Sequence, residues 1–391
     1  ETLGSVTYIC SDKTGTLTQN KMRVEQLVVS GQPESGSTSR QESWRRLMKA
    51  LALSNDATRH EDGHMIGDPT EVALFQGAED RGYGKAELLA QAPRVAELPF
   101  DSDRKCMTTL HRDGSEVVAF TKGAPEQVVA LCDGQLTGDA RIALNPTAIL
   151  DRADRMAAEG LRVLAVAYRA WPGLPAELSP DTVERGLTFL GLVGLMDPPR
   201  EEAREAVALC KSAGITPVMI TGDHPATARA IALRLGIIEN NDAVLTGQEL
   251  AKLPLDEYEA RVEGIRVYAR VSPEQKITIV KGLQDKGEFV AMTGDGVNDA
   301  PALQRADIGI AMGLTGTDVA RESAHMILLD DNFATIVTAV EEGRRIFDNI
   351  RKFIKYALSC NTAEVWTIFL APFLGMPIPL LPIHILWINL V

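Results

Sequence analysis

The residues with the clearest chemical potential form the stretch Cys10-Ser11-Asp12-Lys13-Thr14-Gly15-Thr16. An apolar and β-branched segment, residues 6–10, precedes Asp12 and predicts a buried strand that ends at this carboxylate. Ligands of open α/β sheets bind beyond the carboxyl ends of the strands, so Asp12 would lie beside a bound electrophile. Lys13 and the backbone N–H groups of the turn can bind an anion. Taken alone, Asp-Lys-Thr-Gly is equally typical of an Asx-type turn.

Strands and helices alternate along the chain from residue 189 onward. This alternation predicts an α/β fold with a doubly wound, mostly parallel sheet and helices on both faces. The first strand of this set is expected at residues 189–195. Carboxyl ends of parallel strands lie at one edge of a sheet, and polar residues follow several of these strands. They are Asp197, Thr221, Gly222, Asp223, Arg270, Lys276, Asp295, Asn298 and Asp299.

The residues expected near Asp12 have the composition of a phosphoryl-transfer site. Aspartate carboxylates form acyl phosphates in ATPases, so Asp12 is the candidate nucleophile. Lys13 and Lys276 can neutralise the transferring phosphoryl oxygens, and electrostatic stabilisation of this kind dominates such reactions. Thr221 and Gly222 can donate hydrogen bonds to the same oxygens. We therefore expect these groups to surround one substrate phosphate.

A carboxylate can attack a phosphate anion only if a cation offsets their repulsion. Asp295 and Asp299 lie four residues apart across a Gly-rich turn, and with Asp12 they offer hard oxygen ligands for Mg²⁺. Thr14 adds a hydroxyl and a backbone carbonyl, and Asn298 can orient Asp299 or the phosphate. The sequence therefore predicts a magnesium site at the same edge of the sheet.

Residues 25–188 contain consecutive strand-like runs joined by a hairpin signal, Asp113-Gly114, and they predict an inserted α+β domain around an antiparallel sheet. Phe100 offers an aromatic face, Lys122 a cation and Gly123 room for close backbone approach, as an adenine ring with a phosphate tail requires. Arg162 is a charged residue within a predicted strand. The expected division of the chain is 1–24 and 189–332 for the parallel-sheet domain, 25–188 for the inserted domain and 333–391 for a helical tail.

The composition argues against two classes of function. The chain has 391 residues and a formal net charge of −13, so no nucleic-acid partner is expected, because phosphate-backbone binding needs a basic face. Its five cysteines form no CxxC pair, which argues against a zinc site or a disulfide framework. Scattered, reduced thiols favour a cytoplasmic setting for the folded domains.

The C-terminal tail predicts a membrane segment. A helical pattern with basic residues between positions 344 and 355 leads into residues 356–375, which are nearly free of charge. That length matches the ~20 residues that a membrane-spanning helix needs, and the basic cluster is typical of a cytoplasmic flank. The apolar residues 383–391 predict the start of a second span and hence a truncated helical hairpin in contact with lipid. A buried core helix is the alternative.

Polar residues inside the predicted spans are candidate ligands of a transported cation. Asn361 and Glu364 are three residues apart and share a face of the helix, and Asn389 lies in the second apolar segment. Amide and carboxylate oxygens are hard ligands that suit Ca²⁺.

Several motifs resemble those of the P-type cation-transporting ATPases, whose phosphorylation domain has the haloacid-dehalogenase fold. They are Asp12-Lys13-Thr14-Gly15-Thr16, Thr221-Gly222-Asp223 and Gly294-Asp295-Gly296-Val297-Asn298-Asp299-Ala300-Pro301. The run Lys122-Gly123-Ala124-Pro125-Glu126 resembles the nucleotide-domain motif of the type II branch, which includes calcium and sodium/potassium pumps. The resemblance implies that ATP phosphorylates Asp12. It also implies a nucleotide site formed by Glu71, Phe100, Lys105, Lys122, Gly123, Arg162, Asp197 and Arg270.

This chain departs from the family pattern near the nucleotide site. The family's arginine two places after Phe100 is Ser102 in this sequence, so that contact is missing or comes from a neighbour such as Arg104. The motifs otherwise imply a calcium-pump-like protein. Sodium/potassium pumps carry a similar Asn and Glu at the positions of Asn361 and Glu364, so Na⁺ and K⁺ remain alternatives. Golgi-type calcium/manganese pumps lack the acid at the position of Glu364.

The family's actuator domain and its other membrane helices have no counterpart in this sequence. We therefore expect a fragment that binds ATP and Mg²⁺ but does not transport by itself. One alternative is a free-standing phosphatase of the same fold, which normally has an acid-base aspartate where this chain has Thr14. Without that acid no side chain activates water, which prolongs the life of a phospho-aspartate as a pump requires. A non-enzymatic nucleotide sensor is the other alternative.

Overall fold

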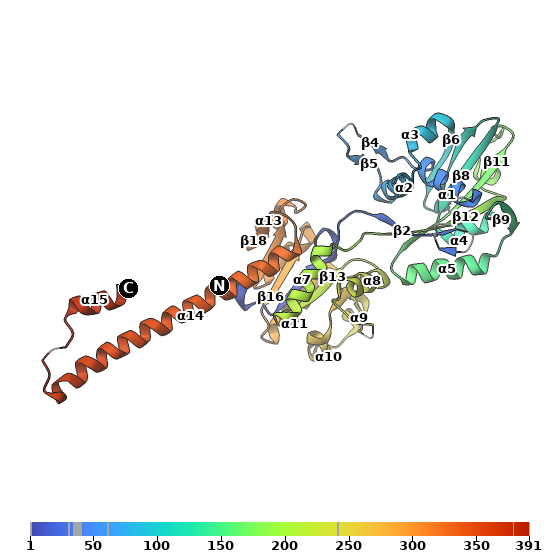
Figure 1. The fold of residues 1–391 in the computed structure, drawn as a ribbon. Coiled ribbons are helices and arrows are strands. Elements are labelled where there is room, and N and C mark those ends of the chain that lie inside the picture. The colour runs from blue at the N-terminus through green and yellow to red at the C-terminus, as the bar shows by residue number, and fades with distance from the viewer. Residues whose placement is uncertain are drawn as a thin grey trace.

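The computed structural model describes residues 2–29, 32–33, 41–60, 62–240, 242–377 and 379–390. The described chain forms two domains and a long projecting helix, which follow one another along the molecule (Figure 1). The N-terminus lies beside the domain from which the helix projects.

A parallel sheet of seven strands, in the order β14-β15-β13-β1-β16-β17-β18, forms the first domain. Its central strand is β1 (Tyr8–Asp12), which pairs in parallel with β13 on one side and β16 on the other. The predicted doubly wound α/β fold is therefore confirmed. The remaining strands are β13 (Thr216–Thr221), β14 (Leu245–Thr246), β15 (Val267–Ala269), β16 (Val290–Gly294), β17 (Ile308–Met312) and β18 (Met326–Leu328).

Helices cover both faces of this sheet because successive strand residues point in opposite directions. Ile9 packs into a core on one face, whereas Tyr8 and Cys10 pack into a second core on the other. The first core is covered by α7 (Glu201–Ser212), α8 (Pro225–Leu235) and the start of α14 (Phe333–Leu370). The second is covered by α9 (Gly247–Lys252), α10 (Leu255–Arg261), α11 (Pro273–Asp285), α12 (Ala300–Arg305) and α13 (Asp318–Ser323).

The second domain is built on a nine-stranded sheet in which seven strands follow the order β10-β9-β12-β11-β8-β7-β6, with β2 paired to β12 and β3 paired to β2. Its pairs are antiparallel, as predicted, except for β9 with β12. The strands are β2 (Arg23–Val29), β3 (Gln32–Pro33), β6 (Arg94–Asp101), β7 (Cys106–Asp113), β8 (Glu116–Gly123), β9 (Cys132–Thr137), β10 (Ala140–Ala143), β11 (Arg162–Trp171) and β12 (Leu187–Met196).

Helices also cover both faces of the second sheet. One face carries α1 (Glu42–Leu53), α2 (Pro69–Glu79) and α3 (Lys85–Gln91). The other carries α4 (Pro125–Ala130) and α5 (Pro146–Ala158). A short helix, α6 (Pro180–Val183), and a two-stranded hairpin of β4 (Thr58–Arg59) and β5 (Met65–Ile66) complete the domain.

The strand predicted over 189–195 exists, but its assignment to the parallel sheet is wrong. β12 pairs with β11, β9 and β2 in the second sheet. All ten residues of β12 are buried, a pattern that is typical of strands in parallel sheets. The burial has another cause, since α1 covers one face of this antiparallel strand and α5 the other. The chain therefore returns to the parallel-sheet domain after Met196, paired with the outgoing strand β2.

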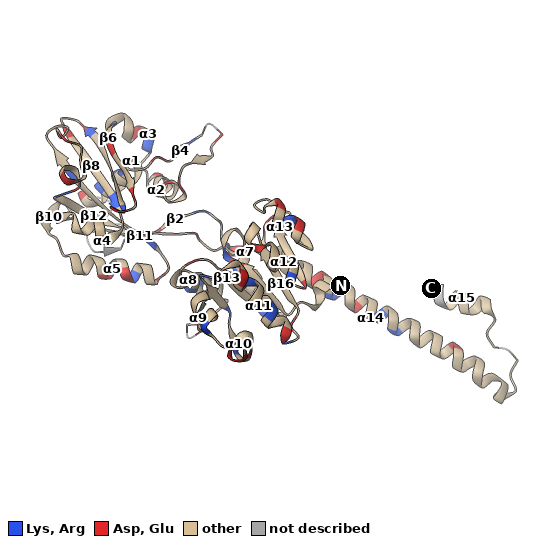
Figure 2. Cartoon of the chain, turned by 180° about the vertical axis from the view of Figure 1, so that it is seen from behind, with Lys and Arg blue, Asp and Glu red and all other residues tan. Residues whose placement is uncertain are grey.

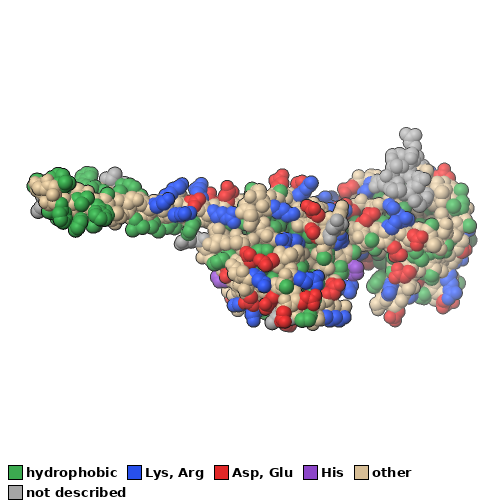
Figure 3. All heavy atoms as spheres, turned by 90° about the horizontal axis from the view of Figure 1, so that it is seen from below, with side chains coloured by type: hydrophobic (Ala, Val, Ile, Leu, Met, Phe, Trp, Pro, Cys, Tyr) green, Lys and Arg blue, Asp and Glu red, His purple; other side chains and the backbone are tan. Residues whose placement is uncertain are grey.

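α14 is a 38-residue helix whose first turns pack on the parallel sheet through Phe333, Ile336 and Val340. It then leaves the domain (Figure 1). Lys and Arg lie on its nearer part, and hydrophobic side chains cover its far end (Figures 2 and 3). Residues Phe333–Leu374 form one helix that is long and apolar enough to cross a membrane, judged by length and composition. The shorter α15 (Pro382–Leu390) follows it.

Candidate functional site

Asp12 and Lys276 form the centre of the candidate site. The Nζ of Lys276, in the first turn of α11, lies 2.7 Å from Oδ2 of Asp12 and 2.7 Å from Oδ1 of Asp299. Burial opposes the charge on this lysine, but the two carboxylates outweigh it and raise the pKa of the ammonium. Lys276 is therefore a permanent cation that holds Asp12 in place.

Three carboxylates meet around this lysine. Oxygens of Asp12, Asp295 and Asp299 all lie within 4.8 Å of one another, and they are the one such acidic group among the described residues. Asp299 is fixed because its Oδ2 accepts hydrogen bonds from the N–H groups of Asp295 and Gly296 at 3.2 and 3.0 Å. Burial raises the pKa of Asp295 to about 6, and the charges of Asp12 and Asp299 add to this shift. Three acids with one lysine fit a hard divalent cation such as Mg²⁺.

The loop after Asp12 bends sharply over the strand end. Gly15 has a φ of 75°, a left-handed conformation that glycine adopts at little cost. Arg200 donates hydrogen bonds to the carbonyl oxygens of Gly15 and Thr18 at 2.9 and 3.0 Å and so fixes the backbone of this loop. Arg200 was not predicted as a site residue, because an arginine after two prolines gives no sign that it binds a loop 182 residues earlier.

Two predicted site residues bind the protein itself. Nζ of Lys13 lies 2.7 Å from Asp223 and 3.9 Å from Asp197. The buried Asp197 accepts hydrogen bonds from the hydroxyl of Thr18 at 2.5 Å and from the N–H of Lys21 at 3.1 Å. Asp197 thus supports the loop after Asp12, and each of its carboxylate oxygens already accepts one hydrogen bond from the protein.

The other predicted site residues of this domain lie at or after the ends of β1, β13, β15 and β16 in the chain. The buried Thr221 accepts a hydrogen bond from the N–H of Asp223 at 3.1 Å. Arg270 is exposed, with a φ of 52°, and its N–H donates to the Asp223 carbonyl at 3.1 Å. Gly222 and Asn298 are also exposed, and Thr14 is half-buried. Gly222, Arg270 and Asn298 are therefore accessible from solvent, Thr14 is partly accessible, and Thr221 is not.

A second polar cluster lies in the other domain, between α1, α2 and β8. Nζ of Lys122 lies 2.7 Å from Oε1 of Glu71 and 2.5 Å from the carbonyl oxygen of Ser54. The other oxygen of Glu71 accepts from the N–H of Asp56 at 2.9 Å. Burial lowers the pKa of Lys122, with Glu71 acting in the opposite direction. The structure thus pairs two residues, Glu71 and Lys122, that the sequence assigned separately to nucleotide binding.

The other predicted nucleotide residues of this domain lie on or between strands β6, β7, β8 and β11 of its sheet. Phe100 on β6 is 64% exposed, so its ring is available for stacking. Lys105 is exposed, and Arg162, also exposed, donates to the Thr70 hydroxyl at 3.0 Å. Gly123 pairs with Cys106 so tightly that a Cβ atom would lie 2.4 Å from the Lys105 carbonyl oxygen.

Arg104 is committed to another partner. Its guanidinium lies 2.5 Å from Oε1 of the buried Glu184 and donates to the carbonyl oxygen of Pro99 at 2.6 Å. It therefore anchors the turn that carries Phe100. The suggested replacement of the family arginine by Arg104 would require breaking this ion pair.

Lys85 and Arg94 belong to the second cluster and were missed by the sequence analysis. Lys85 donates to both oxygens of Asn55, backbone and side chain, and to the Ala57 carbonyl, each at 2.8 Å. Burial lowers the pKa of Lys85 to about 8, and the charge of Arg94 adds to the shift. Arg94 pairs with Asp56 at 2.7 Å. No short motif surrounds either residue, so only the fold reveals them.

The predicted cation ligands of the tail have unequal surroundings. Glu364 is buried, and its Oε1 has no hydrogen-bond partner within the described chain. Asn361, one turn earlier, is exposed. The side chain of Asn389 lies outside the described part of the structure. An unpaired buried carboxylate oxygen is consistent with a ligand position.

Comparisons with known proteins identify relatives of both domains. Residues 43–202 match the family model described as P-type ATPase, cytoplasmic domain N, and residues 163–307 match that of haloacid dehalogenase-like hydrolases. The chain is 46% identical to calcium-transporting ATPase 1 of Bacillus cereus and covers 44% of that protein. It is 44% identical to a probable cation-transporting ATPase F of Mycobacterium tuberculosis and 42% identical to a calcium-transporting ATPase of Bacillus subtilis, covering 46% and 47% of them. All of this chain aligns in each case, so it spans less than half the length of the curated relatives it matches.

Proposed function

We propose that this chain belongs to the P-type ATPase family and is the ATP-binding and phosphorylated part of a pump that moves a cation across a membrane. The observation that carries the proposal is the grouping of Asp12, Lys276, Asp295 and Asp299 at the end of the central parallel strand. A nucleophile, a fixed cation and a divalent-metal site are the parts that phosphoryl transfer requires.

In the proposed reaction Asp12 is the nucleophile. One of its carboxylate oxygens forms a bond to the γ-phosphorus of ATP, the bond from that phosphorus to the β–γ bridging oxygen breaks, and ADP leaves with the electron pair. Lys276 orients Asp12 and offsets the negative charge that gathers around it. The carboxylates of Asp12, Asp295 and Asp299 and the oxygens of Thr14 would hold Mg²⁺, which when bound reduces the repulsion between carboxylate and phosphate.

The inserted domain supplies ATP to this centre. Phe100 stacks on the adenine ring, and Lys122 and Arg162 contact the polar groups and phosphates of ATP, whereas Gly123 lets β8 pack closely against β7. Support comes from the exposed Phe100 ring and from the Glu71–Lys122 pair in the same domain. Glu71 opposes the loss of the proton that burial of Lys122 favours, and a charged lysine here would bind an anionic ligand through a charge-assisted hydrogen bond.

Thr14 favours a pump over a free-standing phosphatase. A phosphatase of this fold needs an acid two residues after its nucleophile to activate water, and a threonine cannot supply one. The acyl phosphate at Asp12 would therefore persist long enough to drive a conformational change. Hydrolysis of small phosphate esters at a rate that ATP leaves unchanged would favour the phosphatase instead.

The proposed cargo is Ca²⁺, and the proposed location is a membrane with both folded domains in the cytoplasm. Two of the relatives named above are called calcium-transporting, and Glu364 offers a buried oxygen ligand on the apolar helix. Asn361 and Asn389 are proposed to complete the set. Transport itself is a property proposed for the whole pump.

Phosphorylation by ATP labelled with ³²P at the γ position tests the proposal. We expect an acid-stable, hydroxylamine-sensitive label in the wild type and none in Asp12→Asn. Stimulation of labelling in the full-length pump, compared across Ca²⁺, Mn²⁺, Na⁺ and K⁺, identifies the cargo. Undiminished labelling of Asp12→Asn would refute the assignment of the nucleophile.

A further inference from the structure

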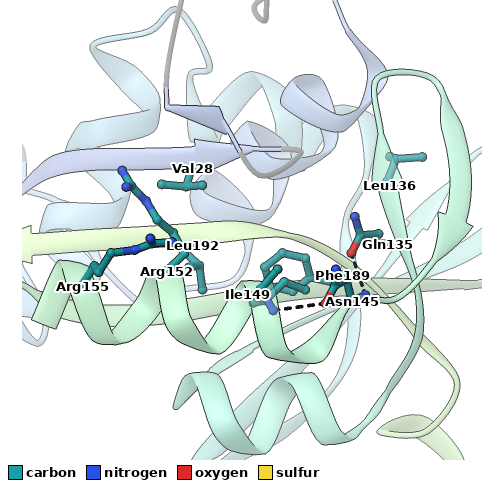
Figure 4. A pocket seen from close by; sticks show the side chains of 10 residues that line it. Val28, Gln135, Leu136, Asn145, Ile149, Arg152, Arg155, Phe189 and Leu192 are labelled. Carbon is teal, nitrogen blue, oxygen red and sulfur yellow. Dashed lines mark hydrogen bonds between the residues drawn. The ribbon is translucent and has the colours of Figure 1, made fainter.

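The inserted domain contains a cavity of about 320 Å³ between its sheet and α5 (Figure 4). Its apolar lining consists chiefly of Val28 from β2, Ile149 from α5, and Phe189 and Leu192 from β12. This is the face of the sheet opposite to α1 and α2, which hold the Glu71–Lys122 pair. The cavity is thus separate from the proposed nucleotide site.

Two arginines on α5 lie together at one end of this cavity (Figure 4). Arg152 and Arg155 are one helical turn apart, and neither guanidinium has an ionic or hydrogen-bonding partner among the described residues. The Nε of Arg152 is buried without an acceptor. Buried donors are nearly always paired in proteins, so an unpaired one inside a cavity indicates a place for an acceptor.

Two amide side chains, Gln135 and Asn145, lie at the other end of the cavity (Figure 4). The N–H of Asn145 donates to Oε1 of Gln135, and the N–H of Ala148 donates to Oδ1 of Asn145, each at 3.1 Å. Each amide oxygen thus accepts one of these bonds, and neither NH₂ group has a hydrogen-bond partner among the described residues. The lining contains no Asp or Glu. Its two charged side chains are therefore both cationic, and its two amides add NH₂ donors.

We propose that this cavity binds a small organic anion. A carboxylate, sulfonate or phosphate group would lie between Arg152 and Arg155, whose planar guanidinium groups match such anions. The apolar body of the ligand would lie against Ile149, Phe189 and Leu192. The volume is at the lower end of the ~300–1,000 Å³ that small-molecule sites occupy, so the ligand is compact.

The test uses the full chain and the aromatic sulfonate 1-anilinonaphthalene-8-sulfonate, followed by its fluorescence. N-phenyl-1-naphthylamine, which has the same aromatic body without the anion, is the uncharged probe. The exposed apolar part of α14 should bind such probes as well, but it is identical in wild type and variants, so the difference between proteins reports on the cavity. Arg112→Gln, which removes an exposed arginine of β7 outside the lining, is the matched control.

We expect a saturable sulfonate component in the wild type and in Arg112→Gln. Its affinity should fall at least tenfold in Arg152→Gln and in Arg155→Gln, while binding of the uncharged amine stays the same. Wild-type melting temperatures and ATP affinities in these variants show that the domain is folded. Equal sulfonate binding by wild type and both cavity variants would overturn the proposal, as would equal loss of the uncharged amine.

Discussion

The Nζ of Lys276 lies 2.7 Å from Oδ2 of Asp12, although 264 positions separate the two residues in the chain. The contact follows from the strand order β15-β13-β1, because α11 begins beyond β15 at the same edge of the sheet where β1 ends. The proposed reaction centre is therefore a product of parallel topology. Any change that removes this lysine should leave the fold of β1 intact and impair the chemistry.

Lys276→Met should slow phosphorylation of Asp12 by about 10²-fold or more, the usual effect of losing one preorganised charge at a reaction centre. The measured quantity is the initial rate of acid-stable ³²P labelling from ATP. Lys276→Arg keeps the charge and should retain more of the rate than Lys276→Met. Labelling of Lys276→Met at the wild-type rate would exclude a role for this lysine.

Lys122→Met should weaken ATP binding by about 10- to 100-fold, because a charge-assisted hydrogen bond contributes about 1.5–3 kcal/mol. Calorimetric titration with a non-hydrolysable ATP analogue measures the affinity. The substitution also leaves the largely buried carboxylate of Glu71 without its cation, which could weaken binding by itself. The double variant Glu71→Gln/Lys122→Met removes that charge and separates the two effects. If the double variant recovers wild-type affinity, the lysine acts only as a counter-ion to Glu71.

Gly123→Ala should destabilise the inserted domain by about 1–3 kcal/mol through overpacking. A Cβ atom at this position would lie 2.4 Å from the carbonyl oxygen of Lys105 and 2.6 Å from Cβ of Cys106. Gly173→Ala is the matched control, because nothing lies within 4 Å of its added Cβ. Urea unfolding should show a change below about 0.5 kcal/mol for the control. Similar effects of the two substitutions would contradict the close packing at Gly123.

His111 should make stability fall in mild acid. It is fully buried, with its ring nitrogens 3.2 Å from the Ala92 carbonyl oxygen and 3.0 Å from the Thr109 hydroxyl, and burial lowers its pKa to about 4. As pH falls from about 6.5 to 4, the unfolded chain takes up a proton that the folded chain does not. The difference corresponds to a loss of about 3 kcal/mol.

Urea unfolding of wild type and His111→Gln at pH 7 and pH 4.5 isolates this contribution, since other titrating groups are common to both proteins. The wild type should lose more stability than the variant over this interval. Equal losses would mean that His111 does not titrate there.

The parallel-sheet domain could be predicted well because its signals are local. Asp12 and the pair Asp295 and Asp299 each follow a buried apolar strand directly, and the edge rule for parallel sheets brings them together. The motifs also marked Glu71 and Lys122, although nothing in their spacing indicated the ion pair between them.

Contacts set by long-range packing could not be predicted. Helices bury β12 on both faces, and nothing in its own ten residues indicates which sheet it joins. Asp197 follows that strand as a ligand-binding acid would, yet it binds Thr18 and Lys21. Lys85 and Arg94 come from separate elements and converge on the backbone around Asn55. In each case the decisive partner lies far away in sequence.

The pairing of β2 with β12 has a mechanical consequence. The two chain segments that join the domains run side by side, from the bridge between Thr18 and Pro199 to the pairs of β2 and β12. A hydrogen-bonded ribbon resists stretching and separation more than a pair of free linkers would, so the inserted domain swings on a stem of nearly fixed length. The stem begins at Thr18, six residues after Asp12, so ATP bound to the inserted domain would stay within a limited distance of Asp12. This restriction raises the effective concentration of ATP at Asp12.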